Sequence, residues 1–105
     1  MKNKILIFGS NGLVGSSISE KLYKNQNNYD VLSSTRKDTN LFDQEQTIKT
    51  IVNTKPNIII NAAAKVGGIY ANDTKRTEFI IENLKINMNI LEACIPFPEI
   101  KIINL

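Results

Sequence analysis

Three glycines near the start of the chain have the spacing of a turn that binds a dinucleotide. The segment Gly9-Ser10-Asn11-Gly12-Leu13-Val14-Gly15 follows an apolar run and precedes a helical pattern. In such a turn Gly9 allows a sharp bend, Gly12 lets a pyrophosphate approach the main chain, and Gly15 lets the helix pack closely on the strand. The phosphates would lie at the helix N-terminus, where unpaired N–H groups and the helix dipole favour an anion. No Gly-Lys-Ser or Gly-Lys-Thr follows, which argues against a P-loop nucleotidase.

Two basic residues follow the second apolar run, at the position that selects between NAD and NADP. An acidic residue there would hydrogen-bond the ribose 2′-hydroxyl of NAD, whereas an arginine accepts the 2′-phosphate of NADP. The chain has Thr35-Arg36-Lys37, which favours NADP, although both cations could equally be solvated surface charges and Asp38 weakens the local field. Asn40 and Leu41 could offer adenine a polar edge partner and an apolar face, while Asp43 is expected to cap the next helix.

These residues need a scaffold, and the hydrophobic pattern predicts one in which strands and helices alternate. Apolar runs predict buried strands at residues 5–8, 29–34, 58–60 and 100–105. Helical periodicity predicts helices from residue 12 to the asparagine cluster at 25–28, from about 43 to 52, and from near 74 to 94. Because parallel strands are joined by right-handed crossovers, the expected fold is α/β, with βαβαβαβ order in an open, doubly wound, Rossmann-type parallel sheet.

The apolar positions of the expected helices predict which side chains face the sheet. They are Leu13, Val14, Ile18 and Leu22, then Ile48, Ile51 and Val52, then Phe79, Ile80, Leu84, Met88 and Leu91. Asp73 or Thr74 is the expected N-cap of the last helix. A parallel strand buried on both faces is a poor natural terminus, so we expect residues 1–105 to be the N-terminal part of a cofactor-binding domain in a longer protein. The alternative is an abbreviated domain that oligomerises through its sheet edge.

Composition narrows the classes of partner. The 105 residues are 42% hydrophobic and 22% charged, which is typical of one soluble globular domain. The net charge of +3 is spread along the chain and forms no basic patch, so a nucleic-acid partner is not expected. The first apolar run is too short for a signal peptide, and none approaches the roughly 18 residues of a membrane span. With Cys94 as the single cysteine, expected in the core, we predict a reducing, cytoplasmic location.

Beyond these patterns, the chain resembles the GDP-L-fucose synthases within the extended short-chain dehydrogenases/reductases, the NAD-dependent epimerase/dehydratase family. The resemblance covers nearly the whole chain, and its most discriminating part is the string after the third apolar run. The matching segments are Gly9-x-x-Gly12-x-x-Gly15, Thr35-Arg36 with Asn40-Leu41-x-Asp43, Asn61-Ala62-Ala63-Ala64-Lys65-Val66-Gly67-Gly68-Ile69 with Ala71-Asn72, and Asn83 and Asn89 with Ile90-Leu91-Glu92-Ala93.

The resemblance implies a binding role for each of these segments. It places NADP, or less favourably NAD, at the turn of residues 9–15, with Arg36 and Lys37 at the 2′-phosphate and Asn40 and Leu41 near the adenine. The backbone of Ala62, Ala63 and Ala64 would pass the nicotinamide half, and Lys65, Val66 and Gly67 would point towards a GDP-sugar, although Lys65 could also merely face water. Members often have a second arginine inside the glycine turn, where this chain has Asn11.

For the whole protein, the resemblance implies a homodimer that epimerises GDP-4-keto-6-deoxy-D-mannose and reduces its 4-keto group with NADPH. The family's catalytic Ser and Tyr-x-x-x-Lys are absent here, since Tyr23, Tyr29 and Tyr70 have no lysine four residues later, and the chain has no histidine. We therefore expect these residues to bind nucleotide without catalysing turnover. The alternatives are another extended epimerase, dehydratase or reductase of sugar nucleotides, a non-catalytic dinucleotide sensor, and a chain that is unfolded or pairs through its edge.

Overall fold

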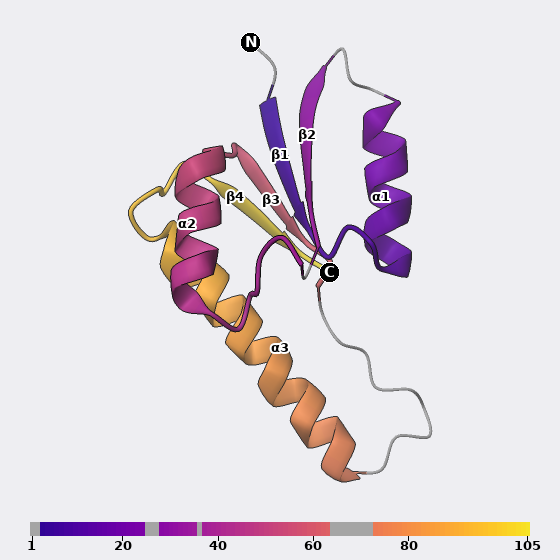
Figure 1. Cartoon of the computed structure of the whole chain (residues 1–105), viewed down its shortest axis with the longest axis vertical. Coiled ribbons are helices and arrows are strands. Elements are labelled where there is room, and N and C mark those ends of the chain that lie inside the picture. Colours follow the sequence, from indigo (N-terminus) through magenta and orange to yellow (C-terminus); the bar gives the residue numbers. More distant parts are fainter. Residues whose placement is uncertain (1–2, 25–27, 36, 64–72) are drawn as a thin grey trace.

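The computed structural model of the protein describes residues 3–24, 28–35, 37–63 and 73–105. For residues 73–76 and 79 it describes the backbone alone. Within these residues, strands and helices alternate as predicted (Figure 1). The strands form one parallel sheet in the order β2-β1-β3-β4. This arrangement confirms the predicted Rossmann-type α/β fold. The elements are β1 Asn3–Phe8, α1 Leu13–Tyr23, β2 Tyr29–Ser34, α2 Gln44–Thr54, β3 Ile58–Asn61, α3 Asp73–Cys94 and β4 Lys101–Asn104.

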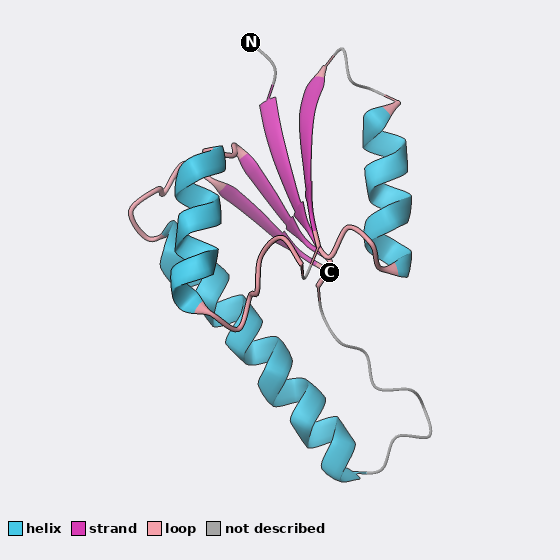
Figure 2. Cartoon of the chain, viewed as in Figure 1, coloured by secondary structure: helices cyan, strands magenta, loops and turns pink. Residues whose placement is uncertain are grey.

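Strand β1 is buried on both of its faces, and this creates two apolar layers. Ile5 and Ile7 belong to a cluster that α1 covers, whereas Leu6 and Phe8 belong to a larger cluster under α2 and α3. Figure 2 shows the same division, with α1 on one face of the sheet and α2 and α3 on the other. The alternation follows from strand geometry, in which successive side chains point to opposite faces.

The prediction for the inward face of α3 was wrong. Ile86 and Ile90 are buried against the sheet, while the predicted positions Ile80, Leu84, Met88 and Leu91 are all about half exposed. The sequence carries two apolar stripes on this helix, and periodicity alone cannot tell which one meets the sheet. In addition, the N-terminal half of α3 extends past the end of the sheet, and none of the described strands lies beside it (Figure 1). The side chain of Phe79 lies outside the described residues.

In α1, the prediction holds for the middle of the helix but not for its first turn. Ile18 and Leu22 pack against the cluster that contains Ile5 and Ile7, as expected. Leu13 is 87% exposed and Val14 is also exposed, so their predicted inward positions are wrong. The first turn meets the rest of the molecule through Gly15, which is buried, and this contact leaves the neighbouring apolar side chains facing solvent.

Helix α2 buries a narrower stripe than its sequence predicts. Ile51 is buried as expected, but Ile48 and Val52 are partly exposed, and Thr47 is buried instead. Thr47 and Ile51 are four residues apart and therefore lie on one face of the helix. The buried Thr47 hydroxyl is satisfied because it donates to the Asp43 carbonyl at 2.9 Å.

Local signals at helix ends agree well with the structure. Asp43 caps α2 as predicted, and its Oδ1 accepts from the N–H groups of Glu45 and Gln46 at 3.0 and 3.3 Å. Lys55 ends that helix with a φ of 49°, ahead of a proline. Helix α3 begins at Asp73, but the side chains that would cap it are not described.

Cys94 is buried as predicted, and burial raises the pKa of its thiol. No helix in the described ranges is long and apolar enough to cross a membrane.

Candidate functional site

The glycine turn connects β1 to α1 and also bonds to the end of β2. The N–H groups of Gly9 and Ser10 both donate to the Ser34 carbonyl, at 3.0 and 3.2 Å. Gly9 has a φ of 74°, and a Cβ built there would lie 2.7 Å from the carbonyl carbon and oxygen of Ala62. Glycine is therefore needed at this bend both for its backbone conformation and for the close approach of the end of β3.

The other two glycines of the turn have different roles. A Cβ on Gly15 would lie 2.0 Å from the Gly9 carbonyl oxygen, so Gly15 lets α1 pack against the turn itself. The sequence predicts that Gly15 lets the helix pack closely on the strand, and the close approach is to Gly9, which directly follows β1. A Cβ on Gly12 would meet the same oxygen at 3.4 Å, an ordinary contact. Gly12 lines a cavity, so its missing side chain leaves room for a ligand and not for another part of the fold.

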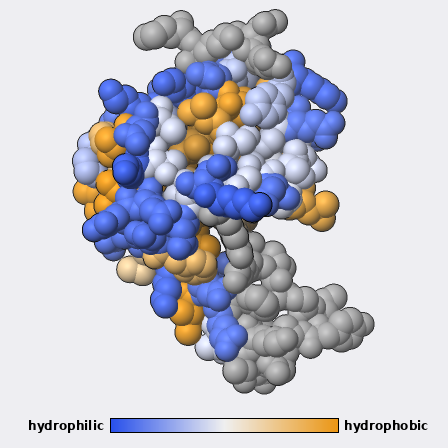
Figure 3. All heavy atoms as spheres, in the orientation of Figure 1, coloured by the Kyte–Doolittle hydropathy of each residue, from blue (hydrophilic) through white to orange (hydrophobic). Residues whose placement is uncertain are grey.

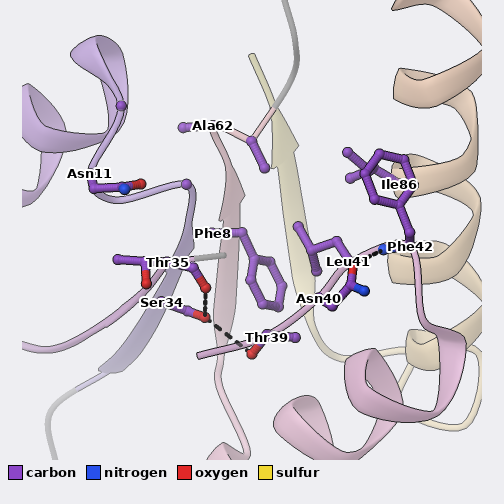
Figure 4. A pocket seen from close by; sticks show the side chains of 13 residues that line it. Phe8, Asn11, Ser34, Thr35, Thr39, Asn40, Leu41, Phe42, Ala62 and Ile86 are labelled. Atoms are coloured by element: carbon purple, nitrogen blue, oxygen red, sulfur yellow. Dashed lines mark hydrogen bonds between the residues drawn. The ribbon is translucent and has the colours of Figure 1, made fainter. Parts of the chain in front are cut away.

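A cavity of about 420 Å³ lies at the carboxyl edge of the sheet (Figure 4). Its volume falls in the range of roughly 300–1,000 Å³ that is usual for small-molecule sites. The chain leaves β1 towards β2 and later returns on the other side of β1 to β3. Open α/β sheets bind ligands at such a switch point. The lining residues are Phe8, Gly9, Asn11, Gly12, Ser34, Thr35, Thr39, Asn40, Leu41, Phe42, Ala62, Ala63 and Ile86.

The loop between β2 and α2 forms one wall of the cavity and is held by both neighbouring helices. The Asn40 N–H donates to the Gln46 side chain of α2 at 3.0 Å, and the Asn40 side chain accepts from the Phe42 N–H at 3.1 Å. From α3, the Asn89 amide donates to the Leu41 carbonyl at 2.8 Å. The wall therefore presents apolar side chains next to a polar edge in a fixed arrangement, which suits a flat aromatic ring with polar edges.

The charges around the cavity favour an anion at the glycine turn. Helix α1 has no acidic residue in its first turn to compensate its positive end. The carboxylate nearest to the end of β2, Asp38, accepts from the N–H and hydroxyl of Thr35 at 2.9 and 3.1 Å. These two bonds, the backbone one more than the hydroxyl one, lower the pKa of Asp38. The Asp38 carboxylate is thus held at Thr35 in its ionised form and does not line the cavity, so the positive end of α1 is the feature that favours an anion here.

The cavity brings together predicted cofactor residues from three separate segments. They are Gly9, Asn11 and Gly12, then Asn40 and Leu41, then Ala62 and Ala63. Five other predicted residues are described but do not line it: Ser10, Leu13, Val14, Gly15 and Lys37. The remaining predictions lie outside the described residues: Arg36, Ala64, Lys65, Val66 and Gly67.

Several lining residues were missed by sequence reasoning. Phe8 and Ser34 end their strands, and Thr35 directly follows one, so their place at the carboxyl edge could have been predicted. Ile86 reaches the cavity from α3 and gives no local signal. In the part of the chain that the structure describes, no group of three or more His, Cys, Asp or Glu side chains could hold a metal ion.

Comparison with known proteins agrees with this geometry. The sequence profile of the NAD dependent epimerase/dehydratase family matches residues 5–104, which is nearly the whole chain. The chain belongs to this family. This match confirms the resemblance that the glycine turn and the Ala62 segment indicate.

Relatives within the NAD dependent epimerase/dehydratase family include enzymes of sugar-nucleotide metabolism. GDP-L-fucose synthase of Sinorhizobium fredii is 39% identical over 86% of this chain and 28% of its own length. A GDP-D-glycero-L-gluco-heptose synthase of Campylobacter jejuni, crystallised in the presence of NADPH, has a TM-score of 0.84 and 29% identity over 98% of this chain and 30% of its own. GDP-L-fucose synthetase of Naegleria fowleri bound to NADP has a TM-score of 0.76 and 29% identity over 97% and 30%. The chain thus spans less than a third of each of these relatives.

Proposed function

We propose that the chain binds NADP in the cavity and forms the cofactor-binding part of a sugar-nucleotide epimerase/reductase of the GDP-L-fucose synthase type. The observation that carries this proposal is the convergence of the glycine turn, the Asn40 loop and the end of β3 on one cavity. Two similar structures, described with NADP and NADPH, support the choice of cofactor. The names of the relatives support a GDP-sugar as substrate.

The described residues that line the cavity suit the pyrophosphate and the adenine of a dinucleotide. Gly12 lines the cavity at the N-terminus of α1, where main-chain N–H groups attract phosphate. Leu41 and Ile86 offer apolar surface to an adenine, and Asn40 is placed beside them for its polar edge. Arg36, which directly follows the Thr35 wall, is the proposed partner of the 2′-phosphate because a guanidinium can bind a phosphate through two nitrogens.

Within the proposed reaction, the residues of this chain bind and orient. When bound, NADPH supplies the hydride that reduces the 4-keto group of the sugar. Lys65, Val66 and Gly67 follow the segment that lines the cavity, and we propose that they continue from the cofactor towards the sugar nucleotide. A proton donor must lie within about 3 Å of the carbonyl oxygen. The sequence contains no histidine and no Tyr-x-x-x-Lys, so we assign none of its residues a catalytic role.

Replacing Arg36 by alanine tests the proposed cofactor preference. Loss of a charge-assisted contact of about 2–3 kcal/mol should raise the Kd of NADPH about 30- to 150-fold and change that of NADH much less. Isothermal calorimetry with both cofactors measures this difference. Lys49→Ala is the matched control, since it removes the same charge from an exposed position of α2 that does not line the cavity. Equal losses for the two cofactors in Arg36→Ala would show that Arg36 is structural.

We also propose that two copies of the chain associate through α3. One stripe of this helix carries large apolar side chains that are about half exposed: Ile80, Ile81, Leu84, Met88 and Leu91. Figure 3 shows hydrophobic side chains at the surface along this helix. Their spacing of three and four residues suits packing against another helix. A two-fold axis would bring the same stripe of a second copy against the first, which is the commonest arrangement in homodimers.

A single charge on the α3 stripe should separate the two copies. Leu84→Glu places a carboxylate at the centre of the stripe, where burial without a partner is costly, so the dimer should dissociate at least about tenfold more readily. Light scattering after size-exclusion chromatography measures the mass. Ser17→Glu adds the same charge to an exposed position of α1 and should leave the mass unchanged. A monomeric wild type, or a Leu84→Glu variant that remains dimeric, would contradict the proposal.

A further inference from the structure

A buried asparagine lies where β3 meets the cavity. Asn61 ends β3 and is only 3% exposed. Its Nδ2 donates to Asn87 of α3 at 2.7 Å and to Asn104 of β4 at 3.2 Å, and its Oδ1 accepts from the Ala63 N–H at 3.1 Å. The orientation of the Asn61 amide is fixed, because the Ala63 N–H can only donate and must face the oxygen.

The sheet itself does not need this side chain. The backbone at the end of β3 is already bonded on both sides, since the Ala62 N–H donates to the Phe8 carbonyl at 3.0 Å and the Leu105 N–H donates to the Asn61 carbonyl at 3.2 Å. An apolar residue would suit a buried strand end, whereas a buried amide is costly unless it is hydrogen-bonded. The amide therefore has a use beyond the pairing of the strands, which the backbone bonds already provide.

That use is visible in the bond to Ala63. An asparagine oxygen that accepts the N–H two residues ahead makes an Asx turn, which competes with continuation of the strand. The turn diverts the chain out of the sheet at Ala62 and Ala63, which then line the cavity. Ala62 also sits against Gly9, where an added Cβ would be 2.7 Å away. The position of the Ala62–Ala63 wall relative to the glycine turn thus depends on how Asn61 is held.

We propose that Asn61 is a positioning residue for the cofactor, and this inference rests on the proposed NADP binding. The oxygen of Asn61 sets the turn at Ala63, and its nitrogen ties that turn to α3 and β4 through Asn87 and Asn104. Asn87 follows Ile86, which lines the cavity from α3 (Figure 4). The amide network therefore links two walls of the cofactor site that lie far apart in the sequence.

A pair of isosteric variants separates positioning from simple stabilisation. Asn61→Val and Asn61→Thr have the same shape and both lose the amide nitrogen that donates to Asn87 and Asn104, but the threonine oxygen can still accept from the Ala63 N–H. Both variants should therefore lose thermal stability, and Asn61→Val should lose more because it forfeits all three bonds. Only Asn61→Val should show faster hydrogen exchange at the Ala63 N–H and an NADPH Kd raised about tenfold, the effect of one hydrogen bond. The measurements are made on the intact gene product by NMR and calorimetry.

The outcomes distinguish this inference from the proposed function. If the wild type does not bind NADPH, the proposed function and the cofactor role of Asn61 both fail before any variant is compared. If the wild type binds and the Val and Thr variants have the same Kd and the same Ala63 exchange, Asn61 is merely structural and the inference is overturned. Should Asn61→Val fold too poorly, Asn87→Ala replaces it, since it removes the 2.7 Å bond that anchors the amide. Unchanged exchange and affinity in Asn87→Ala would likewise overturn the inference.

Discussion

Replacing Gly12 by valine should abolish NADPH binding while leaving the protein folded. Gly12 has extended backbone angles, φ −75° and ψ 172°, which valine adopts readily. The first added atom would meet the Gly9 carbonyl oxygen at an ordinary 3.4 Å, so the fold can accept it. The rest of the side chain would occupy the place of the pyrophosphate, and we expect the Kd to rise at least about 100-fold, equivalent to about 2.7 kcal/mol. Calorimetric titration measures the loss.

The control for Gly12→Val is Lys21→Val, which adds a valine to an exposed position in the last turn of the same helix. Lys21→Val should bind NADPH as the wild type does. The circular dichroism spectra of both variants should match that of the wild type. In Gly12→Val the free energy of unfolding should fall by about 1 kcal/mol, because a β-branched residue is unfavourable at the N-cap. Wild-type affinity in Gly12→Val would remove the glycine turn from the cofactor site.

The strands and the glycine turn could be predicted from the sequence because their signals are local. The Ile58–Ile60 run has few interpretations besides a strand buried on both faces, and the turn of residues 9–15 combines glycine spacing with its place between a strand and a helix. The Asp43 cap is similarly local, since the side chain bonds to N–H groups two and three residues ahead. Element bounds nevertheless moved by one or two residues, as with β1, which begins at Asn3 and not at Ile5.

The helix faces could not be predicted because they depend on partners elsewhere in the fold. Helix α3 has apolar residues on two sides, and the choice of Ile86 and Ile90 for the core is made by where the sheet lies, which no local pattern records. Leu13 is a second example. Its spacing is that of an inward helical position, but Leu13 begins α1 at a point beyond the contact with the sheet, so its side chain is exposed. In both cases tertiary geometry overrides a correct periodicity.

The residues of the candidate site fall into the same two groups, those that a local pattern predicts and those that depend on distant segments. Residues in sequence motifs, such as Gly12 and Asn40, were identified because their neighbours in the sequence reveal them. Ile86 belongs to no motif, and only the folded chain shows that it lines the cavity. Asn61 opens a matching segment, but its bonds to Asn87 and Asn104 join residues 26 and 43 positions apart, which no local pattern predicts. The hydrogen bond from Asn89 to the Leu41 carbonyl joins residues 48 positions apart and is equally invisible to a local pattern.

Replacing Gly15 by alanine should destabilise the fold, which is the reverse of the usual effect in a helix. Alanine in place of glycine inside a helix normally stabilises by about 1 kcal/mol. Here the new Cβ would lie 2.0 Å from the Gly9 carbonyl oxygen and 2.8 Å from its carbon. Overpacking usually costs about 1–3 kcal/mol, and an approach of 2.0 Å to backbone places this site at the top of that range, so the steric cost outweighs the propensity gain. The expected net loss of about 2 kcal/mol is a fall in Tm of about 8–16 °C, measured by differential scanning calorimetry.

Relief of the Gly15 clash is difficult because the turn is held on several sides. The N–H groups of Gly9 and Ser10 are bonded to Ser34, and the Gly9 oxygen accepts from Gly12 at 3.0 Å, so moving that oxygen breaks the turn. Gly12→Ala is the matched control, because it adds the same methyl group three residues earlier at an ordinary 3.4 Å. That variant should lose cofactor affinity with a change in Tm of only a few degrees. If Gly15→Ala were as stable as Gly12→Ala, α1 would not be packed against the glycine turn as the structure places it.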